Sequence, residues 1–109
     1  MSYSIIATQN FRKEIKKLNK KYSSLKTDFS ALLEVLESDP KKGIDLGNNC
    51  YKIRMAISSK GKGKSGGARV ITCFKIQHNC LYLISIFDKS DKENISDKDL
   101  KIFLSQLED

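Results

Sequence analysis

The sequence predicts a single α+β domain in which a small, mainly antiparallel sheet packs against helices. Three observations predict this class. Apolar residues recur at helical spacing in two adjoining N-terminal segments and in one C-terminal segment. Between them lie three segments with the alternation or the short apolar runs of strands, joined by short connections that favour antiparallel pairing. We expect one domain over residues 1–109, in the order β-α-α-β-β-β-α with about four strands.

The N-terminal third predicts one strand and a helical hairpin. Residues 4–7 are short and apolar enough for a strand. A helix is expected from about Phe11 to Tyr22, with apolar residues on one face and lysines mostly on the other. A second helix begins near Ser24 and ends before Pro40, which cannot continue it. Because the break between the helices is short, we expect them to be antiparallel.

The middle of the chain predicts the strands of the sheet. Residues 39–43 and 47–49 are rich in Pro, Gly, Asp and Asn, which are typical of turns. Residues 51–58 alternate between apolar and polar side chains, so Lys52 and Arg54 should leave the same face. A second strand is expected over residues 69–76.

A third strand is expected over residues 81–87, after a turn that contains His78. We interpret His78 as a surface residue of that turn. The third strand is apolar almost throughout, which predicts a central strand covered on both faces.

The C-terminal segment has clear helix-start signals. Ser96 is a good N-cap, Asp99 stands at the capping-box position, and Ile95 can pack against Leu100. The apolar stripe of this helix also predicts which side chains it buries: Leu100, Phe103, Leu104 and Leu107.

Positive charge is concentrated in the middle of the chain. The net charge is +7, yet no Asp or Glu occurs between Leu46 and Phe87. The basic residues of that stretch are Lys52, Arg54, Lys60, Lys62, Lys64, Arg69 and Lys75. An ordinary solvated surface mixes charges of both signs, so a central segment of one sign indicates a face that binds a polyanion such as nucleic acid.

The remaining composition narrows the functional classes. Cys50, Cys73 and Cys80 form no C-x-x-C pair, and with no signal peptide recognised they predict reduced, buried thiols in a cytoplasmic protein. We expect neither a metal site nor a cofactor, since only one His is available to help the cysteines. No apolar run is long enough to cross a membrane.

The glycine-rich stretch SSKGKGKSGGAR, residues 58–69, contains Gly63-Lys64-Ser65, which resembles the end of a phosphate-binding P-loop. That motif needs a glycine where this chain has Ser58, and it needs a helix directly afterwards. The residues that follow predict a strand instead, so we do not interpret the stretch as a nucleotide site.

The central motifs resemble those of a known toxin family. YKIRMAISSKGKGKSGGARVITCF at residues 51–74, followed by LYLISIFDKSDKENIS at residues 81–96, is similar to the RelE/ParE superfamily of bacterial toxins, and within it to the HigB-like branch. The resemblance implies the toxin of a type II toxin–antitoxin system that cuts mRNA in the ribosomal A site. It also implies metal-independent attack of the ribose 2′-hydroxyl, and a cognate antitoxin, usually with a DNA-binding domain.

The resemblance implies roles for four residues. Lys52 would be the general base with Arg54 beside it, because a lysine crowded by cations releases its proton more readily. Arg69, which we expect to face Lys52 from the next strand, would clamp the scissile phosphate. Lys89 stands where relatives often carry an Arg that acts as an acid or a phosphate ligand. Ile95 stands where relatives often carry a substrate-stacking tyrosine.

The lysines around this site are expected to bind RNA. Lys60, Lys62 and Lys64 would form a mobile comb that contacts phosphates, since glycines allow a loop to approach a backbone closely. Lys92 would add a further RNA contact. Two alternatives remain open from the sequence: a ParE-like inhibitor of DNA gyrase, and a basic RNA-binding protein without catalysis.

Overall fold

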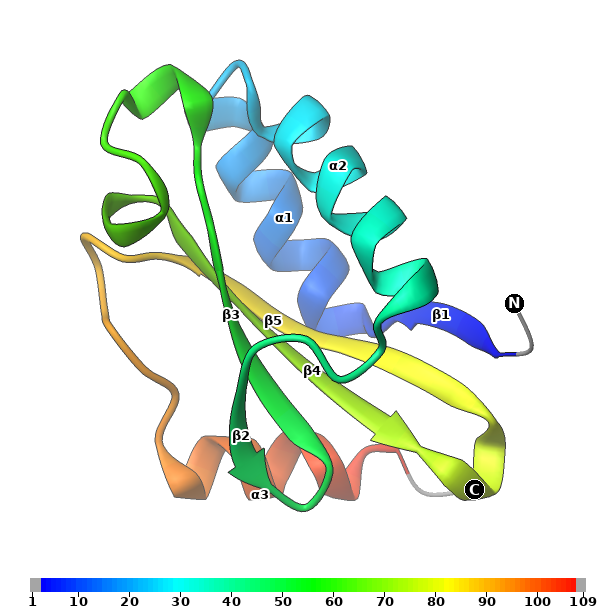
Figure 1. Cartoon of the computed structure of the whole chain (residues 1–109). Coiled ribbons are helices and arrows are strands. Elements are labelled where there is room, and N and C mark those ends of the chain that lie inside the picture. Colours follow the sequence, from blue (N-terminus) through cyan, green and yellow to red (C-terminus); the bar gives the residue numbers. More distant parts are fainter. Residues whose placement is uncertain (1–2, 108–109) are drawn as a thin grey trace.

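The computed structural model describes residues 3–107, which form three α-helices and a five-stranded sheet (Figure 1). The elements are β1 Ser4–Ala7, α1 Gln9–Lys21, α2 Leu25–Ser38, β2 Ile44–Gly47, β3 Cys50–Met55, β4 Ala68–Lys75, β5 Cys80–Asp88 and α3 Asp97–Ser105. Short 3-10 turns lie at Ser58–Lys60, Lys64–Gly66 and Ile76–His78. The predicted α+β class is confirmed.

The sheet has the strand order β1-β5-β4-β3-β2. β1 runs parallel to β5, and the other neighbours are antiparallel. β5 therefore lies inside the sheet, and residues along it are buried on both faces, as its continuous apolar sequence predicts.

The two faces of the sheet are covered by different helices. Residues of α1 and α2, such as Phe11 and Leu32, pack with Ile53 and Val70 on one face. On the opposite face α3 packs over Ile71 and its neighbours. Because side chains alternate along a strand, successive residues of β3 and β4 point into different layers.

The structure adds one strand to the prediction. β2 occupies residues that the sequence analysis did not assign to a strand, and it pairs with the start of β3 to form the edge of the sheet. Positive φ angles at Asn48 and Asn49 close the hairpin tightly. β2 has only four residues and is largely exposed, so its strand geometry comes from pairing with β3 and not from an apolar pattern.

The helix starts follow local capping chemistry. The Thr8 hydroxyl oxygen accepts a hydrogen bond of 3.2 Å from the Phe11 N–H at the start of α1. The Ser96 hydroxyl oxygen does the same for the Asp99 N–H at 3.0 Å, which confirms the predicted N-cap of α3. Among the described residues, no helix has the length and apolar character needed to span a membrane.

Candidate nucleic-acid interface

The four residues predicted to be catalytic lie at or near one end of the β3-β4-β5 region. Lys52 and Arg54 leave β3 on the face that carries α3, as expected from the alternation. Arg54 is paired directly with Arg69 on β4, whereas Lys52 lies opposite Ile71. The expectation that Lys52 faces Arg69 is therefore wrong by two residues, since the register places Arg54 there.

α3 covers only part of its face of the sheet. Its Leu100 packs near Ile71 and Cys73, while Arg54 and Arg69 lie farther along the strands. The connection from β5 to α3 runs along the left side in Figure 1. The Lys92 ammonium of that connection lies 4.6 Å from the centre of the Phe87 ring, so this predicted RNA-binding lysine belongs to the same region.

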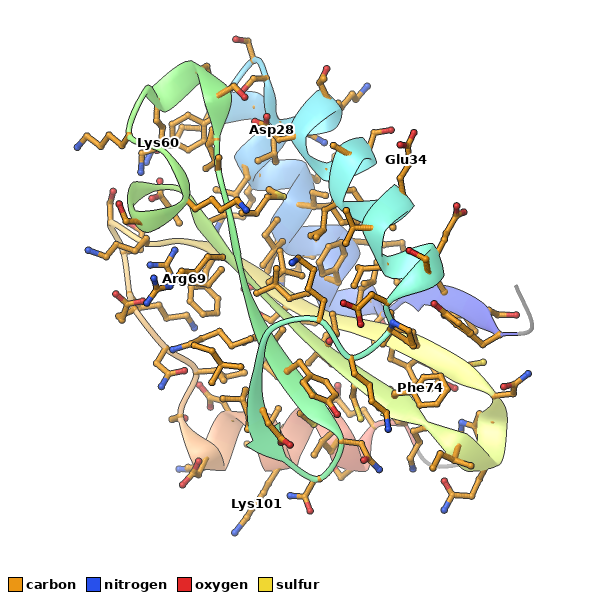
Figure 2. The ribbon with its side chains drawn as sticks, viewed as in Figure 1. Asp28, Glu34, Lys60, Arg69, Phe74 and Lys101 are labelled. Carbon is orange, nitrogen blue, oxygen red and sulfur yellow. The ribbon has the colours of Figure 1, made fainter. Side chains whose placement is uncertain are left out.

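Arg69 does not project into solvent as a free phosphate clamp. Its side chain is only 2% exposed. Figure 2 shows it between the glycine-rich loop and the β5–α3 connection. Its Nε donates to Glu93 at 2.9 Å, and its terminal nitrogens donate to backbone carbonyls at 3.2 Å. Those carbonyls belong to Lys64, Ser65 and Ala68. In this structure Arg69 holds the glycine-rich loop in place through its bonds to the Lys64 and Ser65 carbonyls.

Glu93 is a site residue that the sequence analysis missed. Its carboxylate accepts from Arg69 and also lies 4.0 Å from the Lys89 ammonium. The hydrogen bond from Arg69 lowers the pKa of Glu93 against the opposing effect of burial, and the charges of Arg69, Lys89 and Lys52 lower it further. Its spacing of four residues from Lys89 was the available signal, but i,i+4 pairs are common on ordinary surfaces.

Lys60 is not part of an exposed comb. Its ammonium donates to Asp88 at 2.8 Å and to the Ser90 hydroxyl at 3.0 Å, and its side chain is 8% exposed. Asp88 is fully buried and also accepts from the Tyr22 hydroxyl. Because its amine is occupied inside the protein, the expectation that Lys60 stands in an exposed comb is corrected, while its contact with RNA stays a prediction.

The Asp88 carboxylate is held in its charged form by these partners. Burial alone raises the pKa of Asp88, but hydrogen bonds from Lys60, Tyr22 and Ser90 outweigh that effect and hold the pKa well below its usual range. Lys21 adds a further cation at 3.6 Å. We call this group (Asp88, Lys60, Tyr22, Lys21 and Ser90) the Asp88 cluster.

Further contacts tie the glycine-rich loop to the domain. The backbone N–H of Ser58 donates to Asp28 at 2.8 Å, and the Ser59 N–H donates to the Ser24 hydroxyl at 2.9 Å. Gly67 is pressed against β3: a Cβ there would lie 2.1 Å from the Met55 carbonyl oxygen. The expected mobile comb is thus a loop anchored at both ends.

Lys62 and Lys64 are the lysines of this loop whose side chains remain exposed. Lys64 also lines a groove of about 280 Å³ beside α2, together with Arg54 and Lys42. The floor of this groove is apolar, with Leu32 and Met55 among its residues. Arg54 therefore lies between the face that carries Arg69 and this groove.

His78 and the cysteines lie away from the basic face. His78 is in the 3-10 turn before β5, as expected, and its Nδ1 is 2.8 Å from the Tyr82 hydroxyl. All three cysteines are buried, as predicted, and none forms a disulfide in the structure, where Cys50 lies opposite Cys73. Within residues 3–107, no group of three or more His, Cys, Asp or Glu side chains is arranged to hold a metal ion.

Solved structures share this fold at low sequence identity. The isolated E. coli RelE toxin is 21% identical with a TM-score of 0.55, over 96% of this chain and 99% of that one. RelE in the intact E. coli RelBE toxin–antitoxin complex is 17% identical with a TM-score of 0.57, over 79% of this chain and 95% of that one. A substituted E. coli RelE bound to a RelB peptide is 22% identical with a TM-score of 0.58, over 89% and 98%.

A family model connects the sequence itself with these toxins. The model described as the RelE toxin of the RelE/RelB toxin–antitoxin system matches residues 4–107. This range includes all five strands of the sheet and the three α-helices that cover its faces. The chain therefore belongs to the RelE family of toxins from toxin–antitoxin systems.

Proposed function

We propose that this toxin is a ribosome-dependent endoribonuclease that cuts mRNA in the A site without a metal ion. The observation that supports it most is the convergence of three predicted catalytic cations around one point. Arg69 and Lys89 contact the Glu93 carboxylate, and Lys52 is near enough to lower its pKa. A phosphate at that point would contact Arg69 and Lys89 and would lie within the electrostatic reach of Lys52.

The proposed chemistry needs three functions from these residues. A base removes the proton of the ribose 2′-hydroxyl, cations stabilise the charge of the phosphorane-like transition state, and an acid protonates the leaving 5′-oxygen. We assign the base to Lys52, transition-state stabilisation to Arg54 and Arg69, and the acid or a phosphate ligand to Lys89. The products are a 2′,3′-cyclic phosphate and a free 5′-hydroxyl.

The RNA backbone would be held by exposed lysines around this point. Lys62, Lys64 and Lys92 are exposed and lie on the loop and the connection that border it. Phosphate contacts of this kind fix the position of an RNA without selecting its sequence. The ribosome would then align the scissile bond, because phosphate contacts alone do not select it.

We also propose a cognate antitoxin as partner and the cytoplasm as the site of action. An antitoxin would cover the basic face or pack on the helical hairpin, and an acidic or amphipathic segment suits either surface. The RelE structures in complex with RelB are consistent with such a partner.

The test is primer extension on a defined mRNA in a reconstituted translation reaction, with and without ribosomes and with EDTA at concentrations that translation tolerates. We expect cuts only in ribosome-bound mRNA, at the A-site codon. Lys52→Ala should abolish them, whereas the exposed Lys101→Ala on α3 should cut normally. If no cuts occur, the proposal fails and a gyrase cleavage assay tests the ParE-like alternative.

A further inference from the structure

One carboxylate lies among the cations of the basic face. Glu93 is the acid that contacts Arg69, and its side chain is 55% exposed while that of Arg69 is 2% exposed. Solvent therefore reaches the Glu93 carboxylate but not the Arg69 guanidinium. An ion pair with one exposed partner can exchange that partner at much lower cost than a fully buried pair.

The carboxylate occupies the position that a phosphate oxygen would take. It accepts from the Arg69 Nε at 2.9 Å, and its other oxygen lies 4.0 Å from Lys89. Arginine binds carboxylate and phosphate oxygens with the same planar donor geometry. Both terminal nitrogens of Arg69 donate to backbone carbonyls, and the Nε donor is the one that Glu93 occupies.

The backbone around Glu93 permits its side chain to leave. The connection is held on one side by the Lys89 and Lys92 N–H groups, which donate to the Gly67 and Asp88 carbonyls at 3.0 and 3.3 Å. On the other side Ile95 is buried under α3. Glu93 lies between these anchors with an exposed side chain, so a change of rotamer releases Arg69 without unfolding the connection.

We propose that Glu93 is an exchangeable counter-ion that occupies the phosphate-binding position of Arg69 in the free toxin and is displaced by an RNA phosphate. The contact is autoinhibitory, because each productive binding event must break it. It also keeps the buried guanidinium neutralised and braced until RNA arrives. The inference rests on the proposed function for the identity of the incoming anion.

Binding to a short 2′-O-methyl RNA, which the toxin cannot cut, tests the exchange. We expect Glu93→Gln to bind this RNA more tightly than the wild type in fluorescence anisotropy at 0.1 M salt, by up to about fivefold, as for loss of a partly exposed ion pair. The matched control is Asp91→Asn, which removes the same charge from an exposed acid of the same connection that does not contact Arg69. Equal effects of both variants would overturn the proposal.

The Arg69 side chain can be observed directly by NMR. The chain contains three arginines, Arg12, Arg54 and Arg69, and of these only Arg69 is buried, so its Nε–H signal is the one expected to exchange slowly with water. Saturating RNA should shift this signal in the wild type. In RNA-free Glu93→Gln the signal should no longer appear at the chemical shift that it has in the RNA-free wild type. A signal unaffected by RNA would show that Glu93 is a fixed structural partner.

A shorter acid separates position from charge. Glu93→Asp keeps the net charge but withdraws the carboxylate by one methylene, so it should tighten RNA binding part of the way towards Glu93→Gln. Weaker binding than the wild type would contradict the proposal. None of these measurements needs a ribosome or a cut, so failure of the nuclease proposal in the translation assay remains distinguishable from failure of the exchange.

Discussion

Two ion pairs lie at the same end of the sheet, one on each face, and they have almost the same length. Lys60 contacts Asp88 at 2.8 Å on the side of the helical hairpin, and Arg69 contacts Glu93 at 2.9 Å on the side of α3. Their acids differ completely in environment: Asp88 is 0% exposed and Glu93 is 55% exposed. The acid of one pair is sealed inside the domain, and that of the other is open to solvent.

Because the two distances are nearly equal, burial of the acid is the property that distinguishes the pairs. A buried acid holds the fold together, whereas an exposed acid can be replaced by an incoming anion. The Asp88 cluster fixes the glycine-rich loop to β5 through the Lys60–Asp88 ion pair, and removal of either member of that pair would leave a charge inside the domain. In the Arg69–Glu93 pair the guanidinium is buried against the loop and the carboxylate is exposed. Arg69 can therefore hold the loop while Glu93 is exchanged for another anion, as proposed above. The predictions below test this division.

The largest expected effect is that of Asp88→Asn. This variant leaves the Lys60 ammonium buried without its counter-ion, which should cost about 3–5 kcal/mol of unfolding free energy. Urea denaturation at pH 7 measures it, with Asp91→Asn as the exposed control. Adding Lys60→Met to Asp88→Asn should restore part of the loss, since the unpaired charge is then removed. A loss of unfolding free energy below about 1 kcal/mol would contradict a stabilising role for the Asp88 cluster.

Acid should weaken the wild type through the same cluster. The pKa of Asp88 is lower in the folded protein than in the unfolded chain, so acid protonates the unfolded chain first and favours it. The unfolding free energy should therefore fall as the pH drops below about 5, near the ordinary aspartate range. Asp28 and Glu93, whose pKa values are also lowered, add to this loss. In Asp88→Asn the dependence should be shallower, as urea denaturation between pH 7 and pH 3 would measure; equal slopes would contradict it.

Arg69→Lys should have an intermediate effect on stability. Lysine keeps the charge but cannot hold the Lys64 and Ser65 carbonyls and Glu93 together, so we expect a cost of about 1.5–3 kcal/mol. Its exposed neighbour across the strands provides the control, and Arg54→Lys should change the unfolding free energy by less than about 0.5 kcal/mol. Similar losses in both variants would show that burial of Arg69 carries no special weight.

The smallest effect on stability, with a clear effect on binding, is expected for Lys62→Ala combined with Lys64→Ala. Both side chains are exposed, so the unfolding free energy should change by less than about 0.5 kcal/mol. Two lost phosphate contacts should reduce the slope of log K against log salt for single-stranded RNA by about 1.4. Lys98→Ala with Lys101→Ala, on the exposed side of α3, should leave that slope unchanged.

The class of the fold and much of its layout follow from local patterns in the sequence. Periodicities of 3.6 and 2 residues are local properties, so they were sufficient to predict the helical hairpin, the buried strand β5 and the α3 cap at Ser96. The concentration of basic residues between Leu46 and Phe87 likewise indicated a polyanion-binding face. The edge strand β2 escaped prediction because its geometry depends on pairing with β3 and not on its own pattern.

The availability of each cation to RNA depends on contacts between segments that are far apart in the chain. Lys60, Lys62 and Lys64 alternate with glycines in one loop and are indistinguishable by composition, yet the first is paired inside the domain. The acid that separates Lys60 from the other two, Asp88, comes from a segment more than twenty residues later. Register brings Arg54 opposite Arg69, and burial then assigns each charge to structure or to solvent. Such pairings depend on contacts between distant segments, which no local pattern in the chain records.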